Sequence, residues 1–427
     1  MLRTRGKPCR VLVGVAAAMA FGLGPALGIW SAQPAAGAVA TPGDSVRDTQ
    51  QWVFDMMNVQ PAWQVTEGSG VTVAVLDSGV YPYVSDLSGN SVISGPDFTG
   101  LHTKPENVDW GQHGTWMASI IAGHGHDGGF DGVMGIAPEA KILSIRVIPD
   151  KGDPGYQAYN NEPEEVIQNE LANGIRAAVK DHAQVISMSI GYSAPSGVVR
   201  SAITYAYQHG TVLIASSGNS GGNDTQHGKS SPDMAPVSFP AEYPGVIGVG
   251  AVTITGAQAS FSSGNLSVQI AAPGKGVPAQ GRNGLYYTVD GTSPACALVA
   301  GVAALIKSRY PGISPALVKE ALTTTAQETP SGGYDVYTGF GIVNANAALL
   351  KAGQLMKERP QGSQVPLDAH FGSGPAAVPA PPVAPRGDGQ RVVFIVLALV
   401  SFAVGLAGLT WVIKTRVSRA ERLHGDD

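Results

Sequence analysis

Cysteine is nearly absent from this sequence, which has only Cys9 and Cys296 in 427 residues. Cys9 lies in a basic leader, so a chain that has lost its leader keeps one thiol and cannot form an internal disulfide. A disulfide-stapled fold is therefore excluded, and an exported domain of this chain would be held together by its hydrophobic core alone.

Charged residues are also few, at 14% of the chain, and 27 basic against 32 acidic residues give a formal net charge of −5. No basic patch with interleaved aromatic residues appears, which argues against a nucleic-acid partner. Hydrophobic residues make up 44%, enough for a sizeable core. The 56 glycines indicate many turns and close packing of small residues rather than a coiled coil.

The N-terminus is typical of a secretory signal peptide, which we place at residues 1–40. Basic residues between Arg3 and Arg10 precede an uncharged stretch from Val11 to Trp30, and "AVA" at residues 38–40 fits a small-residue cleavage site. An uncleaved membrane anchor is the alternative, because the uncharged stretch is longer than most signal-peptide cores.

The C-terminus predicts a single membrane span. Residues 351–390 form a Pro/Gly-rich linker, and residues 391–413 form the predicted transmembrane helix. Within that helix, Val392 to Ile413 has no charge and spans about 33 Å, enough for a bilayer core. The basic tail 414–427 would stay in the cytoplasm, so the body of the protein would face outward. A buried core helix is the alternative.

Between residues 70 and 350, strand-like and helix-like segments alternate, after an N-terminal extension at residues 41–69. Continuous apolar runs that indicate buried strands are "VTVAVL" (71–76), "KILSIRVI" (141–148), "VISMSI" (185–190) and "TVLIAS" (211–216). Residues 164–182 carry apolar side chains at helical spacing. This order predicts an α/β fold, with a doubly wound, mostly parallel sheet and helices on both faces.

Four polar residues stand where strands end or helices begin. Asp77 follows "VTVAVL" directly, and Asn219 ends "TVLIASSGN". His113 stands at the start of a helix of small residues, and Ser293 lies just before another that begins at Pro294. Because reactive groups collect at the carboxyl ends of the strands in such sheets, we expect these side chains to lie together.

An aspartate, a histidine and a serine, in that chain order, are the groups that a nucleophilic triad needs. A serine hydroxyl requires an adjacent base, histidine can take and return its proton near neutral pH, and a buried carboxylate fixes the imidazole. An asparagine side chain can supply an oxyanion donor.

Four segments resemble the signature blocks of the subtilisin-like serine proteases: "VAVLDSGV", "HGTWMASIIAG", "ASSGNSGG" and "GTSPACALVAG". Intervening runs such as "SFPAEYPGVIGVGAV" also read like that family, over about residues 70–347. The chain order separates the sequence from chymotrypsin-like and α/β-hydrolase enzymes. The whole layout is most similar to the mycosins, the membrane-tethered subtilases of type VII secretion systems.

The resemblance implies a role for each candidate. Asp77 would orient His113, which would act as general base and then general acid, and Ser293 would attack the scissile carbonyl. Asn219 and the backbone N–H of Ser293 would form the oxyanion hole.

The resemblance also implies a substrate-binding region. The backbone groups that would pair with an extended peptide are those of Ser189, Ile190 and Gly191. The residues that would line the first specificity pocket are Ala215, Ser216, Ser217 and Gly218.

The sequence departs from the family in several places. Pro294 replaces the family's usual methionine, and about 30 residues between Ala40 and Val71 leave no room for a long folding pro-domain. The disulfides of mycobacterial members cannot form. We find no convincing carboxylate cluster for calcium and expect no cofactor. The bond Phe239–Pro240 matches a family position with a cis peptide.

Structural roles are the alternative for each candidate. Asp77 could cap a turn, Ser293 could be a plain helix N-cap, and Asn219 could serve only a left-handed turn. Cys296 is expected to be a small core thiol.

The sequence thus predicts a serine endopeptidase anchored in the cell membrane, with its protease domain on the extracytoplasmic side. Its partners would be exported protein or peptide substrates and components of a secretion system. The alternative function is a structural component of a secretion complex, in which the protease fold mainly serves assembly.

Overall fold

The computed structural model describes residues 45–358, apart from 90, 102, 107–109, 127–130 and 222–234, together with the backbone of Trp30–Ser31. The predicted signal peptide lies outside these residues except for Trp30 and Ser31. Most of the predicted linker, the predicted transmembrane segment and the basic tail also lie outside them. Among the described helices, none combines the length and apolar character needed to cross a membrane.

Within the described residues, the largest sheet has seven strands, in the order β11-β10-β9-β7-β2-β6-β3. Every neighbouring pair in it is parallel. The strands are β2 (Thr72–Asp77), β3 (Val92–Asp97), β6 (Lys141–Arg146), β7 (Val185–Met188), β9 (Val212–Ser216), β10 (Val246–Val252) and β11 (Val268–Pro273). Strands β7, β9 and β10 are buried at every position, as expected for a sheet covered on both faces.

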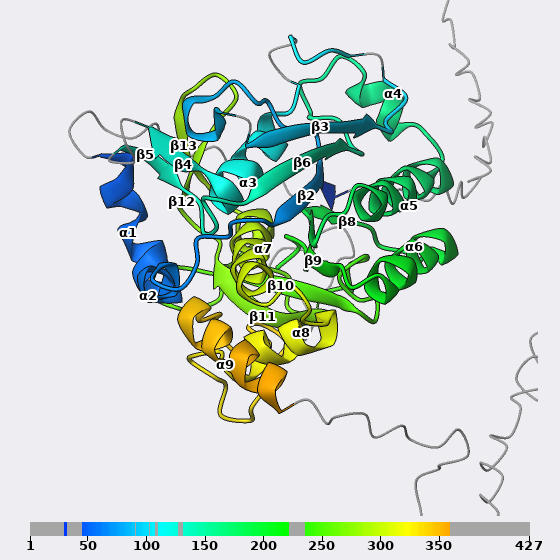
Figure 1. The fold of residues 1–427 in the computed structure, drawn as a ribbon. Helices are drawn as coiled ribbons and strands as arrows, with labels where there is room; N and C mark the ends of the chain where they lie inside the picture. Colours follow the sequence, from blue (N-terminus) through cyan, green and yellow to red (C-terminus); the bar gives the residue numbers. More distant parts are fainter. Residues whose placement is uncertain are drawn as a thin grey trace, which may run out of the picture. The chain divides into compact units, whose positions relative to one another are not determined.

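Helices cover both faces of this sheet (Figure 1). On one face α5 (Glu164–Lys180) and α6 (Gly197–Gln208) pack on a core that includes Leu76 and Ile186. On the other, α3 (Gln112–Ala122) and α7 (Thr292–Arg309) pack on a core that includes Val75 and Val249. The predicted doubly wound α/β fold is confirmed.

The N-terminal extension forms α1 (Val46–Met57) and α2 (Val59–Trp63). Ser45 caps α1 by accepting a hydrogen bond from Asp48 N at 3.1 Å. The side chains of Val53, Phe54 and Met57 are buried in the same core as α7. The extension is therefore packed onto the domain rather than separate from it.

Smaller elements complete the described part of the chain. They are β1 (Trp30–Ser31), η1 (Ser85–Leu87), β4 (His124–His126), β5 (Asp131–Met134), α4 (Tyr156–Asn160), β8 (Ile190–Gly191), β12 (Val277–Gln280), β13 (Tyr286–Val289), α8 (Pro315–Thr324) and α9 (Ala345–Lys357). The bond Phe239–Pro240 is cis, as the sequence predicts.

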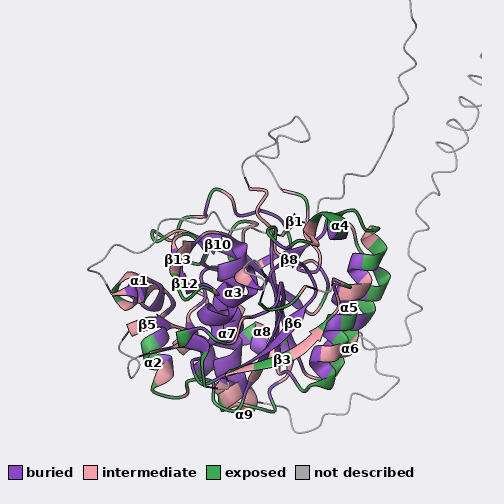
Figure 2. Ribbon diagram, turned by 90° about the horizontal axis from the view of Figure 1, so that it is seen from above, coloured by how far each residue is buried: buried purple, intermediate pink, exposed green. Residues whose placement is uncertain are grey.

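Helix α7 differs from the surface helices because it has no exposed face. Every residue from Thr292 to Lys307 is buried, whereas α5 and α6 alternate buried and exposed positions (Figure 2). The small residues of "SPACALVAG" allow the sheet and neighbouring helices to approach this helix on all sides. Ser293 therefore belongs to an element that the whole domain surrounds.

Candidate active site

Asp77 is the last residue of β2 and is 1% exposed. Its Oδ1 lies 2.7 Å from His113 Nδ1 and also accepts a hydrogen bond from Ser78 N at 2.7 Å. With the carboxylate ionised, the imidazole donates through Nδ1, which leaves Nε2 as the basic nitrogen. Two residues that are 36 positions apart in sequence thus form one buried hydrogen-bonded pair.

His113 is the second residue of α3, and two glycines set its position. Gly111 caps the helix at φ 74°, a conformation that favours glycine. A Cβ on Gly114 would lie 2.1 Å from the carbonyl oxygen of Gly79, so only glycine lets α3 come this close to the loop after β2. This approach brings the imidazole within reach of Asp77.

Ser293 is the second residue of α7, and α7 packs against α3. The sequence places the helix start at Pro294, which is wrong: the helix begins at Thr292, with Gly291 as its N-cap at φ 149°. Pro294 still falls in the first turn, where backbone N–H groups have no intrahelical partner, so its missing donor costs no helix hydrogen bond. Ser293 lies at the positive end of the helix dipole.

The side chain of Asn219 is oriented by Thr292. Both the N–H and the hydroxyl of Thr292 donate to Asn219 Oδ1 at 2.9 Å, which leaves Nδ2 as the donor end of the amide. A Cβ on Gly291 would lie 3.3 Å from Asn219 Nδ2 and 3.6 Å from Ser293 N. The two nitrogens therefore lie around the same glycine, where a side chain at position 291 would crowd both, an arrangement compatible with the predicted oxyanion hole.

The predicted substrate strand already has a partner within the chain. Ile190 and Gly191 form β8, which pairs antiparallel with Trp30 and Ser31 of β1. The hydroxyl of Ser189 donates to the carbonyl oxygen of Ser293 at 3.5 Å. This backbone can therefore accept an added strand, and it lies next to the predicted nucleophile.

The residues predicted for the specificity pocket lie at the end of β9. Ala215 and Ser216 are its last two residues, and Ser217 and Gly218 follow it. The first three are buried, and Gly218 is half-buried at φ 104° with its N–H bonded to Thr292 Oγ1 at 3.3 Å. The segment is thus fixed to the same turn that carries Ser293.

Sequence reasoning missed Asp150, which lies in the loop after β6. Its carboxylate accepts hydrogen bonds from the backbone N–H groups of Gln112, at 2.7 Å, and His113, at 3.2 Å. Burial raises the pKa of Asp150 to about 6, and the neighbouring charge of His113 acts in the opposite direction. No motif marks this residue, and its link to α3 spans nearly 40 positions.

Sequence reasoning also missed Arg146, a buried residue that contacts the chain next to Asp77. It was missed because it reads as one more strand residue in "KILSIRVI". Its side chain is 2% exposed and forms ion pairs of 2.7 Å with Asp97 and Asp153. Its Nε donates to the carbonyl oxygen of Ser78 at 3.2 Å. The arginine thus fixes the backbone next to Asp77.

Cys296 is fully buried in α7, as expected for a core thiol. Burial raises its pKa to about 12, so the nucleophilic thiolate is not formed near neutral pH.

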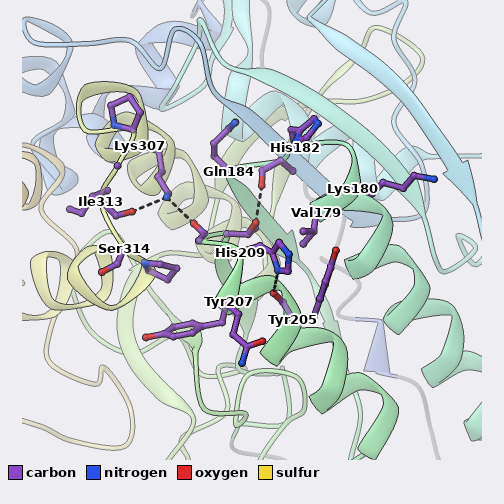
Figure 3. Close-up of a pocket in the computed structure, with 17 residues that line it drawn as sticks. Val179, Lys180, His182, Gln184, Tyr205, Tyr207, His209, Lys307, Ile313 and Ser314 are labelled. Atoms are coloured by element: carbon purple, nitrogen blue, oxygen red, sulfur yellow. Dashed lines mark hydrogen bonds between the residues drawn. The ribbon is translucent and has the colours of Figure 1, made fainter. Parts of the chain in front are cut away.

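A cavity of about 700 Å³ (Figure 3) lies at the end of the sheet where β7 and β9 begin, opposite the end that carries Asp77. It is lined by the segments that precede β7 and β9 and by Lys307 near the end of α7, whose Nζ donates to the carbonyl oxygens of Gly210 and Ile313. Asp77 lies at the carboxyl edge of the sheet, so this cavity is not part of the candidate active site.

The acidic residues of the described part of the chain bear on the question of a metal site. No group of three or more histidine, cysteine, aspartate or glutamate side chains among them is arranged to hold a metal ion. The fully buried carboxylate of Asp86 instead accepts protein donors, from His126 Nδ1 at 2.8 Å and Val133 N at 2.7 Å.

The comparisons with known proteins agree with this geometry. The model of the subtilase family matches residues 68–341. Subtilisin DY of Bacillus licheniformis is 33% identical, covering 66% of this chain and 92% of its own, and thermitase of Thermoactinomyces vulgaris is 32% identical, covering 72% and 99%. The chain belongs to the subtilase family and is a subtilisin-like serine peptidase.

Solved structures of mycosins are similar to this chain. MycP1 from Mycobacterium smegmatis is 28% identical with a TM-score of 0.60, covering 74% of this chain and 88% of its own. The MycP3 protease of the type VII (ESX-3) secretion system is 29% identical with a TM-score of 0.60, covering 76% and 94%. The predicted resemblance to subtilases, and among them to mycosins, is confirmed.

Proposed function

We propose that this protein is a membrane-anchored serine endopeptidase that cleaves exported proteins through Asp77, His113 and Ser293. The observation that carries the proposal is the buried 2.7 Å pair of Asp77 and His113 at the carboxyl edge of the sheet, with Ser293 at the start of the helix packed against α3. Asp77 holds the imidazole in the tautomer that a general base requires.

In the proposed reaction, His113 Nε2 takes the hydroxyl proton of Ser293 as the oxygen attacks the scissile carbonyl carbon. The resulting imidazolium is stabilised by Asp77 and then gives its proton to the leaving amine. Water, activated by the same imidazole, hydrolyses the acyl-enzyme and restores the serine.

The negative charge that develops on the carbonyl oxygen would be held by Asn219 Nδ2 and Ser293 N. Their common position around Gly291 supports this role, as does the bond from Thr292 that fixes the amide. Because these donors are already oriented, no reorganisation is needed when the charge forms.

The substrate would bind as an added antiparallel strand along Ser189–Gly191, with one side chain entering the pocket of Ala215–Gly218. The pairing of β1 with β8 outside the main sheet supports this mode, because an extended segment already pairs with Ile190 and Gly191 there.

We further propose that the enzyme is a single-pass protein of the cell membrane whose protease domain lies on the extracytoplasmic side. The uncharged segment Val392–Ile413 and the basic tail after it support this orientation. The similarity to mycosins supports an association with a type VII secretion system.

The proposal predicts labelling by a fluorophosphonate serine probe. Wild-type protein should be labelled and Ser293→Ala should not, because the probe needs an activated serine hydroxyl. In-gel fluorescence measures the difference. Cys296→Ser is the matched control and should still be labelled, since this thiol lies in the same helix but takes no part in the reaction. A wild-type protein without labelling would refute the enzyme proposal.

One observation favours the structural alternative: a similar structure is described as that of a serine protease that is an essential component of a type VII secretion system. Comparing Ser293→Ala with a deletion strain separates the two functions. If secretion continues in Ser293→Ala but substrate processing stops, the enzyme proposal stands. If processing also continues in Ser293→Ala and only the deletion blocks secretion, the protein serves assembly.

A further inference from the structure

Asp150 takes the place of a side-chain cap for α3. The N-cap residue is Gly111, which offers no side chain, so the first N–H groups of the helix need another acceptor. Both carboxylate oxygens of Asp150 supply it, Oδ2 to Gln112 N at 2.7 Å and Oδ1 to His113 N at 3.2 Å. His113 is therefore held at two points: Asp77 accepts from its ring, and Asp150 accepts from its main-chain N–H.

We propose that Asp150 is a positioning residue for His113, fixing the start of α3 and placing a negative charge beside the imidazole. The inference rests on the proposed function, because it assigns Asp150 a role through the general base. Asp150 itself touches neither the substrate nor the reacting atoms.

The groups that face Asp150 come from two elements. His113 on α3 stabilises its charged form, whereas Asp77 at the end of β2 opposes it, and the side chain of Ser78 donates a hydrogen bond to it. On the far side of Ser78, the charge of Arg146 is taken up by its own two carboxylate partners. The imidazolium of His113 is thus the cation that this carboxylate is placed to stabilise.

The contribution of Asp150 to stability depends on pH. Its pKa of about 6 in the folded protein is raised above the ordinary value of 3.8, with desolvation as the largest cause. For an acid with a raised pKa, the stabilisation belongs to the protonated form, which is complete below pH 3.8 and is lost as the pH rises through 6. At neutral pH this protonation-linked stabilisation is absent, so the charged form is held at a cost in desolvation, as is common for groups at functional sites.

The test compares the full-length wild type with Asp150→Asn, which, like a protonated carboxyl group, keeps one of the two acceptor oxygens and carries no charge. On a quenched fluorescent peptide, Asp150→Asn should lower kcat by roughly 3- to 30-fold with KM unchanged, the range for one favourable charge interaction. The acid limb of its kcat/KM profile should shift to lower pH. Its Tm should be higher than that of the wild type at pH 8 and equal to it at pH 4.

Asp153→Asn is the matched control, because Asp153 is a buried carboxylate in the same loop that pairs with Arg146. It should lower the Tm and leave the acid limb where it is. If Asp150→Asn leaves kcat and the acid limb unchanged, or lowers the Tm equally at both pH values, Asp150 is only a structural cap and the inference is wrong. Fluorophosphonate labelling of the wild type separates this result from a failure of the proposed function, since an unlabelled wild type overturns both.

Discussion

Asn219 has one end of its amide fixed by Thr292, so its donor is oriented before a substrate arrives. We predict that Asn219→Ala lowers kcat by about 10²–10³, a magnitude taken from subtilisin, and leaves KM nearly unchanged, because the donor acts on charge that exists only in the transition state. Steady-state kinetics on a peptide substrate measure both constants.

Thr292→Val is the control for Asn219, because it removes the hydroxyl donor but keeps the Thr292 N–H bond to Oδ1. Its loss of kcat should be smaller. An equal loss in the two variants, or none in Asn219→Ala, would contradict the role of Asn219 as an oxyanion donor.

The residues that sequence reasoning found and those it missed differ in where their partners lie. Asp77 and His113 stand at the end of a strand and the start of a helix, within recognisable motifs, and a parallel sheet brings such positions together. Asp150 stands in the polar loop "PDKGDPG", and nothing local shows that its partners are the backbone N–H groups of α3. A hydrogen bond to a backbone N–H does not depend on the side chain of the partner residue, so the partner position carries no sequence signal for the contact.

At the scale of elements, the close approach of α3 to the loop after β2 depends on Gly114. A Cβ at this position would meet Gly79 O at 2.1 Å and Asp77 Cβ at 3.3 Å. We predict that Gly114→Ala displaces α3, lengthens the Asp77–His113 bond and destabilises the fold by about 1–3 kcal/mol, the usual cost of overpacking. The Tm, measured by thermal unfolding, and kcat should both be lower than in the wild type.

Gly197→Ala at the start of α6 is the matched control, because a Cβ there meets nothing within 4 Å. It should leave kcat unchanged and should not lower the Tm, because alanine has a higher helix propensity than glycine. If Gly114→Ala behaves like Gly197→Ala, the packing of α3 does not set the position of His113.

The sequence predicted the elements better than it predicted their ends. Apolar runs located β2, β6, β7 and β9, because strands buried on both faces have few polar residues. The start of α7 was placed two residues late, since proline suits the first helical position and the cap is a glycine without a side-chain signal. Backbone conformation at Gly291, rather than residue type at Pro294, sets this boundary.

At the scale of the whole molecule, anchoring and catalysis are assigned to different parts of the chain. We predict that the full-length protein stays with the membrane fraction after a carbonate wash, because Val392–Ile413 would span the bilayer. A chain ending at Glu358 should be released into the medium and remain reactive with the serine probe. Immunoblots of the membrane fraction and the medium test this prediction. A chain that lacks only the basic tail is the control, and release of the full-length protein into the medium would contradict the prediction.

Helix α7 links the reaction to the integrity of the entire domain. The predicted nucleophile occupies the second position of a helix that is buried through Lys307 and packs on both α3 and the sheet. Because no side of the helix between Thr292 and Lys307 faces solvent, a change in its packing has few ways to relax without moving Ser293. If Ser293 is the nucleophile, loosening of the core around α7 should abolish activity together with the fold, so a chain that has begun to unfold should already be inactive.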